Sequence, residues 1–447
     1  MRDAAPTPSF PHSSRPSLAY SGAMLALLGI VVVVIGLLVS IAWHELGHMW
    51  PAKRFGVKVS EYFVGFGPTL WSTKRGETEY GIKAIPLGGY VRLVGMVPPA
   101  YAVKSASVRG WGKTLVADAR AASEAEIGED DGRAFYHLAW WRKVIVMAGG
   151  PVMNLVLAIV LFTVVLSAMG VPTQSLTVRD TISCVPAAGA NECTSGDPPS
   201  PAVLAGLQPG DTVLSADGIE LDGWSDLTGY VSERPGQPVV LTIDRDGRVF
   251  DLGVTPAARD RVGAVGEQAQ AVGFLGVYSL VEDERQPIWS GAEIAGTYTV
   301  ETAKIVATLP VQLYHVTRAA IGLEDRSQTS VMGIVGIGRA AGDVTSTEIE
   351  GVTLKDQVAQ LLLLLAGLNL ALFVFNMIPL VPLDGGHIAS ALWQAMKNGW
   401  ARARNAPRPA PVDVARMMPV AYGVFGILIV MSLVLIYADI VAPVRIT

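Results

Sequence analysis

The sequence predicts a polytopic α-helical membrane protein with four transmembrane helices, a membrane-associated β-hairpin region and an extracytoplasmic β-rich domain. Only 16% of the 447 residues are charged and the mean hydropathy is +0.40, whereas soluble chains carry about a quarter charged residues. Four apolar runs are free of charge, and two intervening segments carry the glycine and proline punctuation of β-structure. The small net charge of −5 argues against nucleic acid as a partner.

Each apolar run is long enough for the roughly 20 residues that cross a bilayer. The first run could instead be a cleaved signal peptide, but its apolar stretch is too long and no small-residue cleavage site ends it. We therefore predict an N-terminal tail over 1–22, transmembrane spans and a C-terminal tail over 439–447. The spans cover 23–56, 143–171, 358–383 and 418–438.

Basic residues predict the orientation, because cytoplasmic loops carry an excess of Lys and Arg. Residues 44–143 contain 14 of them, whereas the loop over 171–355 contains 12, against 25 acids counted as far as Asp356. We expect a plasma-membrane protein in which the first segment and the 384–417 loop are cytoplasmic. The acidic loop and both termini are then extracytoplasmic. Cys184 and Cys193 lie in the outer loop, where a disulfide and two free thiols are equally expected.

Three further segments separate the spans. Residues 57–97 alternate β-forming residues with glycines, which predicts a β-hairpin region. Residues 98–140 contain many Ala, Ser and Glu and are predicted to form a flexible cytoplasmic insert. Within the region 285–356, residues 288–323 have helical apolar spacing interrupted by charges such as Glu293 and Lys304. That pattern favours an amphipathic helical region at the outer interface over a fifth span.

The outer loop contains a compact β-rich module over 176–282, with short strands between Gly and Pro turns. Its string Ala205-Gly-Leu-Gln-Pro-Gly-Asp211 resembles bacterial PDZ domains. The resemblance implies capture of a peptide C-terminus on backbone N–H groups, in a loop formed here by Gly273, Phe274, Leu275 and Gly276. The alternative is a degenerate PDZ domain that only fills space over the active site.

The chemistry is predicted by His44-Glu45-Leu-Gly-His48 at the end of the first span. Two histidines at i and i+4 share one helix face and can bind one metal ion, and the glutamate between them can act as a general base. A catalytic zinc site has three protein ligands and an open position. Ionisable side chains at the end of an apolar span are usually functional, which weighs against two merely interfacial histidines.

Asp384 is the predicted third ligand. Spans one and three both run from outside to inside, so their C-terminal ends, which carry His44, His48 and Asp384, reach the same depth in the membrane. A carboxylate oxygen is an acceptable zinc ligand. His387 is the competitor, but it lies beyond Gly385-Gly386 and is expected to be a neighbour. His12 and His137 lie in polar, loop-like sequence, and His315 lies in the segment expected outside the membrane.

Taken together, these motifs resemble the site-2 protease family, the bacterial intramembrane metalloproteases that carry a PDZ domain. The resemblance covers nearly all of 24–437 and includes Gly150-Pro-Val-Met-Asn154 and Leu383-Asp-Gly385. It implies a Zn²⁺ site formed by His44, His48 and Asp384, with Glu45 as the catalytic base. Its implied substrates are single-pass membrane proteins, such as anti-sigma factors, after a first extracytoplasmic cut.

The resemblance also implies that 57–97 is a membrane-reentrant hairpin that presents an edge to an extended substrate. Substrate-binding residues would be Gly65, Phe66, Gly67, Asn154 and Asn376. The sequence departs from the family pattern at Val381, which replaces the second proline of Asn-x-x-Pro-x-Pro-x-Leu-Asp-Gly.

Two other functions compete with proteolysis. A catalytically inactive PDZ membrane scaffold would not need the intact His44, Glu45, His48 and Asp384. A metal transporter could use intramembrane His, Glu and Asp, but it has no evident need for a PDZ domain or a substrate-presenting hairpin. For the PDZ domain itself, we expect exclusion of bulky partners rather than capture of a C-terminus, because exclusion requires no intact groove.

Overall fold

The computed structural model describes residues 16–103, 112–128, 131–186, 193–194, 196–261, 270–327, 330–346, 353–407 and 409–444. The chain divides into two compact units. The helical unit consists of Met1–Ser167 and Pro287–Thr447, and the β-rich unit consists of Ala168–Gln286.

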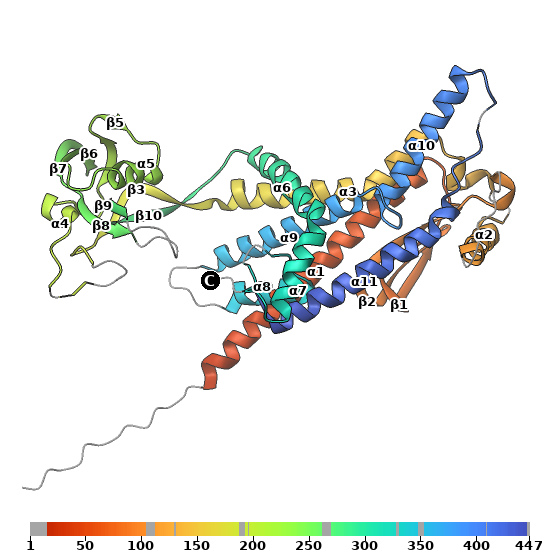
Figure 1. Ribbon diagram of the computed structural model, residues 1–447, viewed down its shortest axis with the longest axis horizontal. Helices are drawn as coiled ribbons and strands as arrows, with labels where there is room; N and C mark the ends of the chain where they lie inside the picture. The colour runs from red at the N-terminus through yellow and green to blue at the C-terminus, as the bar shows by residue number, and fades with distance from the viewer. Residues whose placement is uncertain are drawn as a thin grey trace, which may run out of the picture. The chain divides into compact units, whose positions relative to one another are not determined.

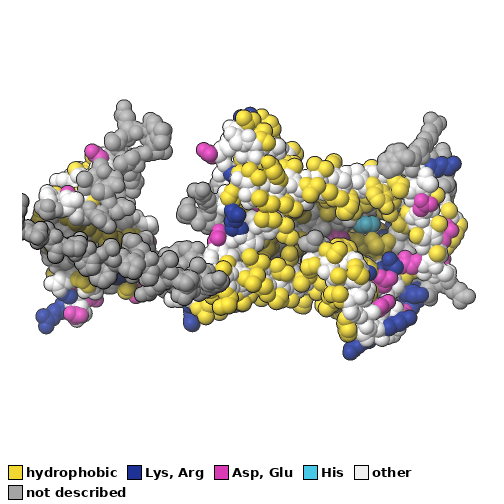
Figure 2. All heavy atoms as spheres, turned by 90° about the horizontal axis from the view of Figure 1, so that it is seen from below, with side chains coloured by type: hydrophobic (Ala, Val, Ile, Leu, Met, Phe, Trp, Pro, Cys, Tyr) yellow, Lys and Arg dark blue, Asp and Glu magenta, His cyan; other side chains and the backbone are white. Residues whose placement is uncertain are grey.

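Four helices in the described ranges are long and apolar enough to cross a membrane, as predicted. They lie roughly along one another in the helical unit (Figure 1). Figure 2 shows hydrophobic side chains over most of one face of this unit, with charged ones gathered toward its ends. The helices are α1 (Pro16–Arg54), α3 (Trp140–Thr163) with a π-helical turn over Val164–Met169, α9 (Leu354–Asn376) and α11 (Met418–Val441).

Helices also form in two segments that were predicted as a flexible insert and a loop. Helix α2 (Gly112–Ile127) lies in the 98–140 insert, and α10 (Asp384–Ala403) lies in the 384–417 loop. The predicted flexible insert is therefore wrong for α2, whereas α10 lies within the segment predicted to join spans three and four. Both helices bury small or apolar residues against neighbouring elements, for example Val116 in α2 and Ala391 in α10, so packing stabilises what composition alone did not indicate.

The 285–356 region forms three helices, α6 (Ser290–Ala307), α7 (Leu309–Ala320) and α8 (Ile334–Ser346). Helix α8 packs against α1 and α9. Its Ala341 is fully buried in a cluster with Val33 of α1 and Leu365 of α9. Its Thr345 Oγ1 donates a hydrogen bond to the Leu25 carbonyl at 2.7 Å. The 288–323 stretch with helical apolar spacing contains α6 and α7, and the position of the region at the outer interface stays a prediction.

A buried ion pair fixes the C-terminal end of α11. Arg326 Nη2 lies 2.8 Å from Asp439 Oδ1, and both side chains are almost fully buried. The other carboxylate oxygen accepts hydrogen bonds from the backbone N–H groups of Gly333 and Gly336 at the start of α8. Because every charge is paired and the anion faces a helix N-terminus, the burial is tolerated.

The β-hairpin region folds as two long bent strands, β1 (Val59–Arg75) and β2 (Thr78–Leu93). The first half of β1 lies between the two halves of β2: Glu61–Val64 pair with Gly89–Arg92 on one side and with Glu79–Ile82 on the other. The second half of β1 covers the remaining side of Thr78–Lys83. The segment Gly89–Leu93 is thus an edge of this small sheet, since no other described strand pairs with it.

The β-rich unit is a sheet in the order β10-β3-β4-β6-β7, with β5 beside β4 and a separate β8–β9 hairpin. Its core contains Val213, Leu227, Leu241 and Ile243, all nearly inaccessible. The elements are β3 (Val171–Thr181), α4 (Pro201–Ala205), β4 (Thr212–Ala216), β5 (Ile219–Glu220), α5 (Trp224–Ser232), β6 (Val239–Arg245), β7 (Arg248–Val254), β8 (Ala257–Arg261), β9 (Gln270–Phe274) and β10 (Val277–Glu284).

Asp211 anchors this unit. Its buried carboxylate meets Arg245 at 2.6 Å and accepts the Gln208 N–H at 2.8 Å. Burial alone would raise the pKa of Asp211, but the Arg245 and Gln208 hydrogen bonds outweigh it and hold the pKa below its usual value. The Pro-Gly-Asp string is therefore a structural feature of the turn before β4.

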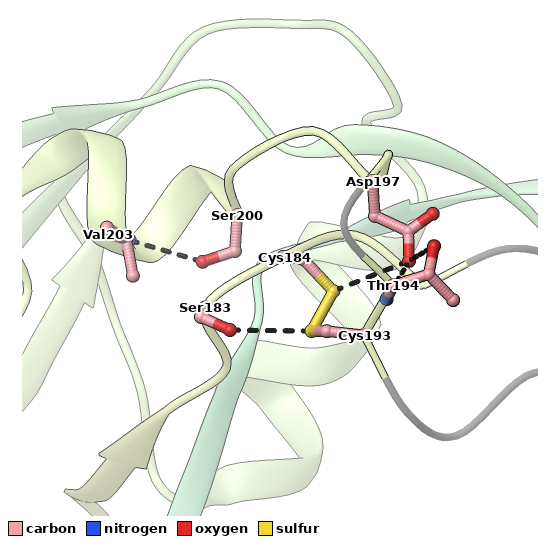
Figure 3. Close-up of a disulfide and its surroundings, with 7 residues drawn as sticks. All are labelled: Ser183, Cys184, Cys193, Thr194, Asp197, Ser200 and Val203. Carbon is pink, nitrogen blue, oxygen red and sulfur yellow. Dashed lines mark hydrogen bonds between the residues drawn. A yellow bond between two sulfur atoms is a disulfide. The ribbon is translucent and has the colours of Figure 1, made fainter. Parts of the chain in front are cut away.

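Cys184 and Cys193 form a disulfide, with their Cα atoms 5.8 Å apart (Figure 3). Asp197 organises the adjoining turn by accepting hydrogen bonds from the Thr194 N–H and hydroxyl. Of the two alternatives left open by the sequence, the pair of free thiols is wrong.

Candidate active site

The metal-ligating groups of α1 and α10 meet at one point. His44 and His48 are one helical turn apart, and their Nε2 atoms lie 3.2 Å from each other. Asp384 Oδ2 lies 3.3 Å from each of these nitrogens. Among the described residues, His44, His48 and Asp384 are the group whose ligand atoms are close enough to share an ion.

The chain folds back tightly to deliver Asp384. After α9 ends at Asn376, a turn containing a cis Val381–Pro382 bond leads into the first residue of α10. A Cβ at Gly385 would lie 2.2 Å from the Ile378 carbonyl oxygen, and one at Gly386 would lie 2.5 Å from the Val381 nitrogen. Two glycines after Asp384 are therefore required for this close return of the backbone.

The donor set fits zinc. In a tetrahedral site with metal–ligand bonds of about 2.0–2.1 Å, ligand atoms are separated by about 3.3–3.4 Å. The three separations here, 3.2, 3.3 and 3.3 Å, agree with that geometry. Two imidazoles and one carboxylate leave the fourth position open, which is the arrangement of a catalytic rather than a structural site.

The outer nitrogens of both imidazoles have partners that leave Nε2 free for metal. His48 Nδ1 lies 2.8 Å from the Val146 carbonyl of α3, so it carries the proton. The Asn154 amide lies 3.2 Å from His44 Nδ1, and Asn154 Oδ1 has no hydrogen-bond partner among the described residues. Turning the amide over gives that buried oxygen a partner, the Nδ1–H that a metal-bound His44 carries.

Glycines let α3 approach the ligands. A Cβ at Gly150 would lie 2.2 Å from His48 Nε2, and Gly47 of α1 and Gly149 of α3 are in direct backbone contact. Small residues at a helix crossing allow this proximity in membranes. Helix α3 therefore forms one wall of the site and supplies the partners of both histidines.

Glu45 faces the open side of the site. It is nearly buried and accepts a hydrogen bond from the Val91 backbone N–H at the sheet edge. A Cβ at Gly89 would lie 3.2 Å from Glu45 Cγ, so only glycine lets the strand pass this closely. The three ligands, Glu45 and the edge line one cavity of about 420 Å³ together with Asn376 and His387.

Comparison with known proteins agrees with this geometry. Residues 32–418 match the model of peptidase family M50. The chain belongs to peptidase family M50.

The alignments with named relatives cover most of the length of this M50 peptidase. It is 34% identical to the zinc metalloprotease Rip1 of Mycobacterium tuberculosis, over 94% of this chain and 99% of the relative. It is 32% identical to Rip1 of Mycolicibacterium smegmatis, over 95% and 100%, and 31% identical to the metalloprotease MmpA of Caulobacter vibrioides, over 83% and 88%. The predicted resemblance, zinc and metalloendopeptidase activity are thereby confirmed, and the M50 peptidase is a multi-pass plasma-membrane protein.

Some of the remaining candidate residues line the catalytic cavity and others lie elsewhere. Asn376 lines the cavity at the end of α9, and His387 lines it without joining the ligand group. His137 pairs with Asp131 and His315 with Glu324, and His12 lies outside the described residues. Gly273–Gly276 belong to the β-rich unit, where they line a cavity of about 460 Å³ with α5.

Gly65, Phe66 and Gly67 do not line the catalytic cavity, although they were expected to bind substrate. Both glycines have positive φ, and Phe66 packs over Gly88 and stacks with Tyr90. They therefore shape the bend of β1 beside the sheet edge. The residues at the cavity are Gly88–Val91, which the sequence placed in the hairpin without assigning them a role.

Proposed function

We propose that this M50 zinc metallopeptidase hydrolyses peptide bonds in or beside the transmembrane segments of single-pass membrane proteins. The activity would belong to regulated intramembrane proteolysis, with anti-sigma factors already cut once outside as its partners. The observation that carries the proposal is the position of the site. His44, Glu45 and His48 lie in a helix apolar enough to span a bilayer, and an open sheet edge lines the same cavity.

Each residue has a separate task in this reaction. His44, His48 and Asp384 would hold zinc, which would act as a Lewis acid toward the scissile carbonyl and make water a stronger nucleophile. Glu45 takes the proton from the attacking water and delivers it to the leaving amine. A substrate helix hides its amides in i→i−4 hydrogen bonds, so it unwinds before attack. The backbone of Gly89–Leu93 and the Asn376 amide then satisfy the freed groups, which would otherwise cost several kcal/mol each in lipid.

The orientation follows the distribution of basic residues. The site, the hairpin region, α2 and α10 face the cytoplasm, and the β-rich unit and both termini lie outside. The segment 66–71 of β1 supports a membrane-reentrant position, because it carries no charge and exposes Phe66, Leu70 and Trp71.

The β-rich unit is proposed to be a PDZ domain over 176–282. Among the described residues, no backbone hydrogen bond uses the N–H of Leu275 or Gly276, and the cavity there is walled by Leu227 and Val231 of α5. Free N–H groups beside an apolar cavity are what a peptide carboxylate and its last side chain require. This geometry supports capture, whereas size exclusion remains the expectation from sequence alone.

Purified protein with a single-pass model substrate tests the function. We expect cleavage that maps to the span or its border and stops when zinc is chelated. Glu45→Gln should retain zinc and lose cleavage by at least a thousandfold, because it removes the base but no ligand. Asp384→Ala should lose both. An active Glu45→Gln variant, or zinc-loaded wild-type protein that cleaves no membrane substrate, would leave the scaffold and transporter alternatives.

A further inference from the structure

A second hollow continues from the catalytic cavity along the same strand edge. It measures about 470 Å³ and shares Tyr90, Val91, Leu93 and Met96 with the catalytic cavity. Its opposite wall is helix α2, through Ala119, Ala122 and Ser123, and Met418 at the start of α11 also lines it. The hollow is therefore a groove between an open strand edge and a helix, and one of its ends is the active site.

The α2 wall is held firmly against the edge. Ser123 Oγ donates to the Val97 carbonyl at 2.6 Å, and Glu126 accepts from Ser60 at 3.2 Å. Arg120 Nη2 lies 2.5 Å from Asp413 Oδ2, a pair in which both side chains are mostly buried. These contacts attach α2 both to the hairpin region and to the segment before α11, so the groove has two built walls.

We propose that this groove binds the extended flank of the substrate on the cytoplasmic side of the scissile bond; the proposal rests on the function proposed above. From Gly89 beside Glu45 to Leu93 the edge runs about 13 Å at about 3.3 Å per residue, enough for about four residues of bound strand. Backbone pairing with the edge supplies affinity, as in other strand-addition sites.

Side-chain selection comes from the α2 wall. The small side chains of Ala119 and Ala122 leave room opposite the strand for substrate side chains. Met96 and Met418 add an apolar surface that can adapt to different side chains. The charged residues of the groove are engaged with one another, since Arg92 contacts both Glu61 and Glu126. The preferred flank is therefore extended and carries small or apolar side chains, and a bulky residue facing Ala122 is excluded.

Filling the groove with a large side chain tests the proposal. After the cleavage site is mapped, two substrates are compared: one with its full cytoplasmic flank and one truncated two residues beyond the scissile bond. In Ala122→Trp the ratio of kcat/KM for the long substrate to that for the short one should fall at least tenfold, at unchanged zinc content. Ala121→Trp, on the exposed side of α2 outside the groove, should leave both rates as in wild type. An unchanged ratio in Ala122→Trp would refute the proposal that the groove binds the substrate flank.

Cross-linking gives a readout that does not depend on turnover. In a Glu45→Gln background, Ala122→Cys should form a disulfide with a cysteine placed three to five residues into the substrate flank, and Ala121→Cys should not. Cross-links without wild-type cleavage would support the groove and refute the proposed function. Wild-type cleavage without cross-links, together with an unchanged ratio of kcat/KM values, would support the proposed function and refute the groove as a substrate site.

Discussion

Asn154 shows how a single side chain can be assigned two different tasks. From the sequence it was expected to bind substrate, and that remains a prediction. In the structure its side chain is fully buried and its amide faces His44 Nδ1. An amide that holds the imidazole raises ligand basicity and fixes the tautomer, so we now expect its main effect on the metal.

Asn154→Ala should lower zinc affinity by about 10–100-fold, the usual cost of losing such a partner. With saturating zinc, KM for the substrate should stay within about twofold of wild type. Competition with a fluorescent chelator measures the first quantity and steady-state cleavage the second. Normal zinc affinity combined with a raised KM would contradict the effect on the metal and support the substrate-binding role predicted from the sequence.

The reactive residues were predictable because each follows from a local rule. The i, i+4 spacing places His44 and His48 together, and the parallel direction of spans one and three brings Asp384 to the same depth. Gly89 and the Val146 carbonyl were not predictable in this way. A glycine signals a close approach without naming its partner, and a backbone carbonyl leaves no mark on the sequence.

At the scale of elements, the hairpin region was predicted but its pairing was not. Alternation and glycines indicate strands, whereas the insertion of the first half of β1 between both halves of β2 depends on bends at Gly65 and Gly67. That arrangement decides which segment becomes the free edge. Helix α2 was missed because its Ala, Ser and Glu content was interpreted as that of a flexible insert, whereas burial of residues such as Val116 and Ile127 stabilises the helix.

The free edge predicts a dependence on substrate helicity. Gly or Pro placed near the scissile bond should speed cleavage several-fold, because the unwound form costs less to reach, and a poly-Leu span should slow it. Initial rates over such a series, with zinc and detergent fixed, provide the measurement. A Gly or Pro placed at the far end of the same span is the control. Equal rates throughout would remove the role of the Gly89–Leu93 edge.

The β-rich unit allows a direct choice between capture and exclusion. If Leu275 and Gly276 hold a carboxylate, amidating the C-terminus of a pre-cut substrate should slow cleavage several-fold. Under size exclusion, amidation should change nothing, and deleting about 176–282 should permit cleavage of uncut substrates. Cleavage rates of matched free-acid and amide substrates separate the two.

At the scale of the whole molecule, the four apolar helices were predicted from their charge-free runs, and the β-rich unit from its short strands between Gly and Pro turns. The expected orientation, with the site toward the cytoplasm, is a prediction that no contact within the chain can test, because the bilayer is its reference. The same distribution of Lys and Arg that predicts it also places α2 and α10 on the site's side.

Single cysteines test this orientation. Cysteine at exposed Ala121 or Arg404 should react with a membrane-impermeant maleimide only in inverted vesicles, and cysteine at Asp222 of the β-rich unit only in intact cells. The background is low because both native cysteines are joined to each other. Labelling of Ala121→Cys from the outside would overturn the topology.

The Cys184–Cys193 disulfide can also report whether a molecule has been inserted into the membrane correctly. Disulfides persist in oxidising compartments, whereas cytosolic thiols are kept reduced. If the central loop lies outside, as proposed, a chain would acquire this bond only after that loop has been exported. The fraction of molecules with blocked thiols is then a count of completed insertions. A chain that fails to thread its second and third helices would carry two reactive sulfurs, and denaturing alkylation of whole cells would separate correctly inserted molecules from failures without any added reporter.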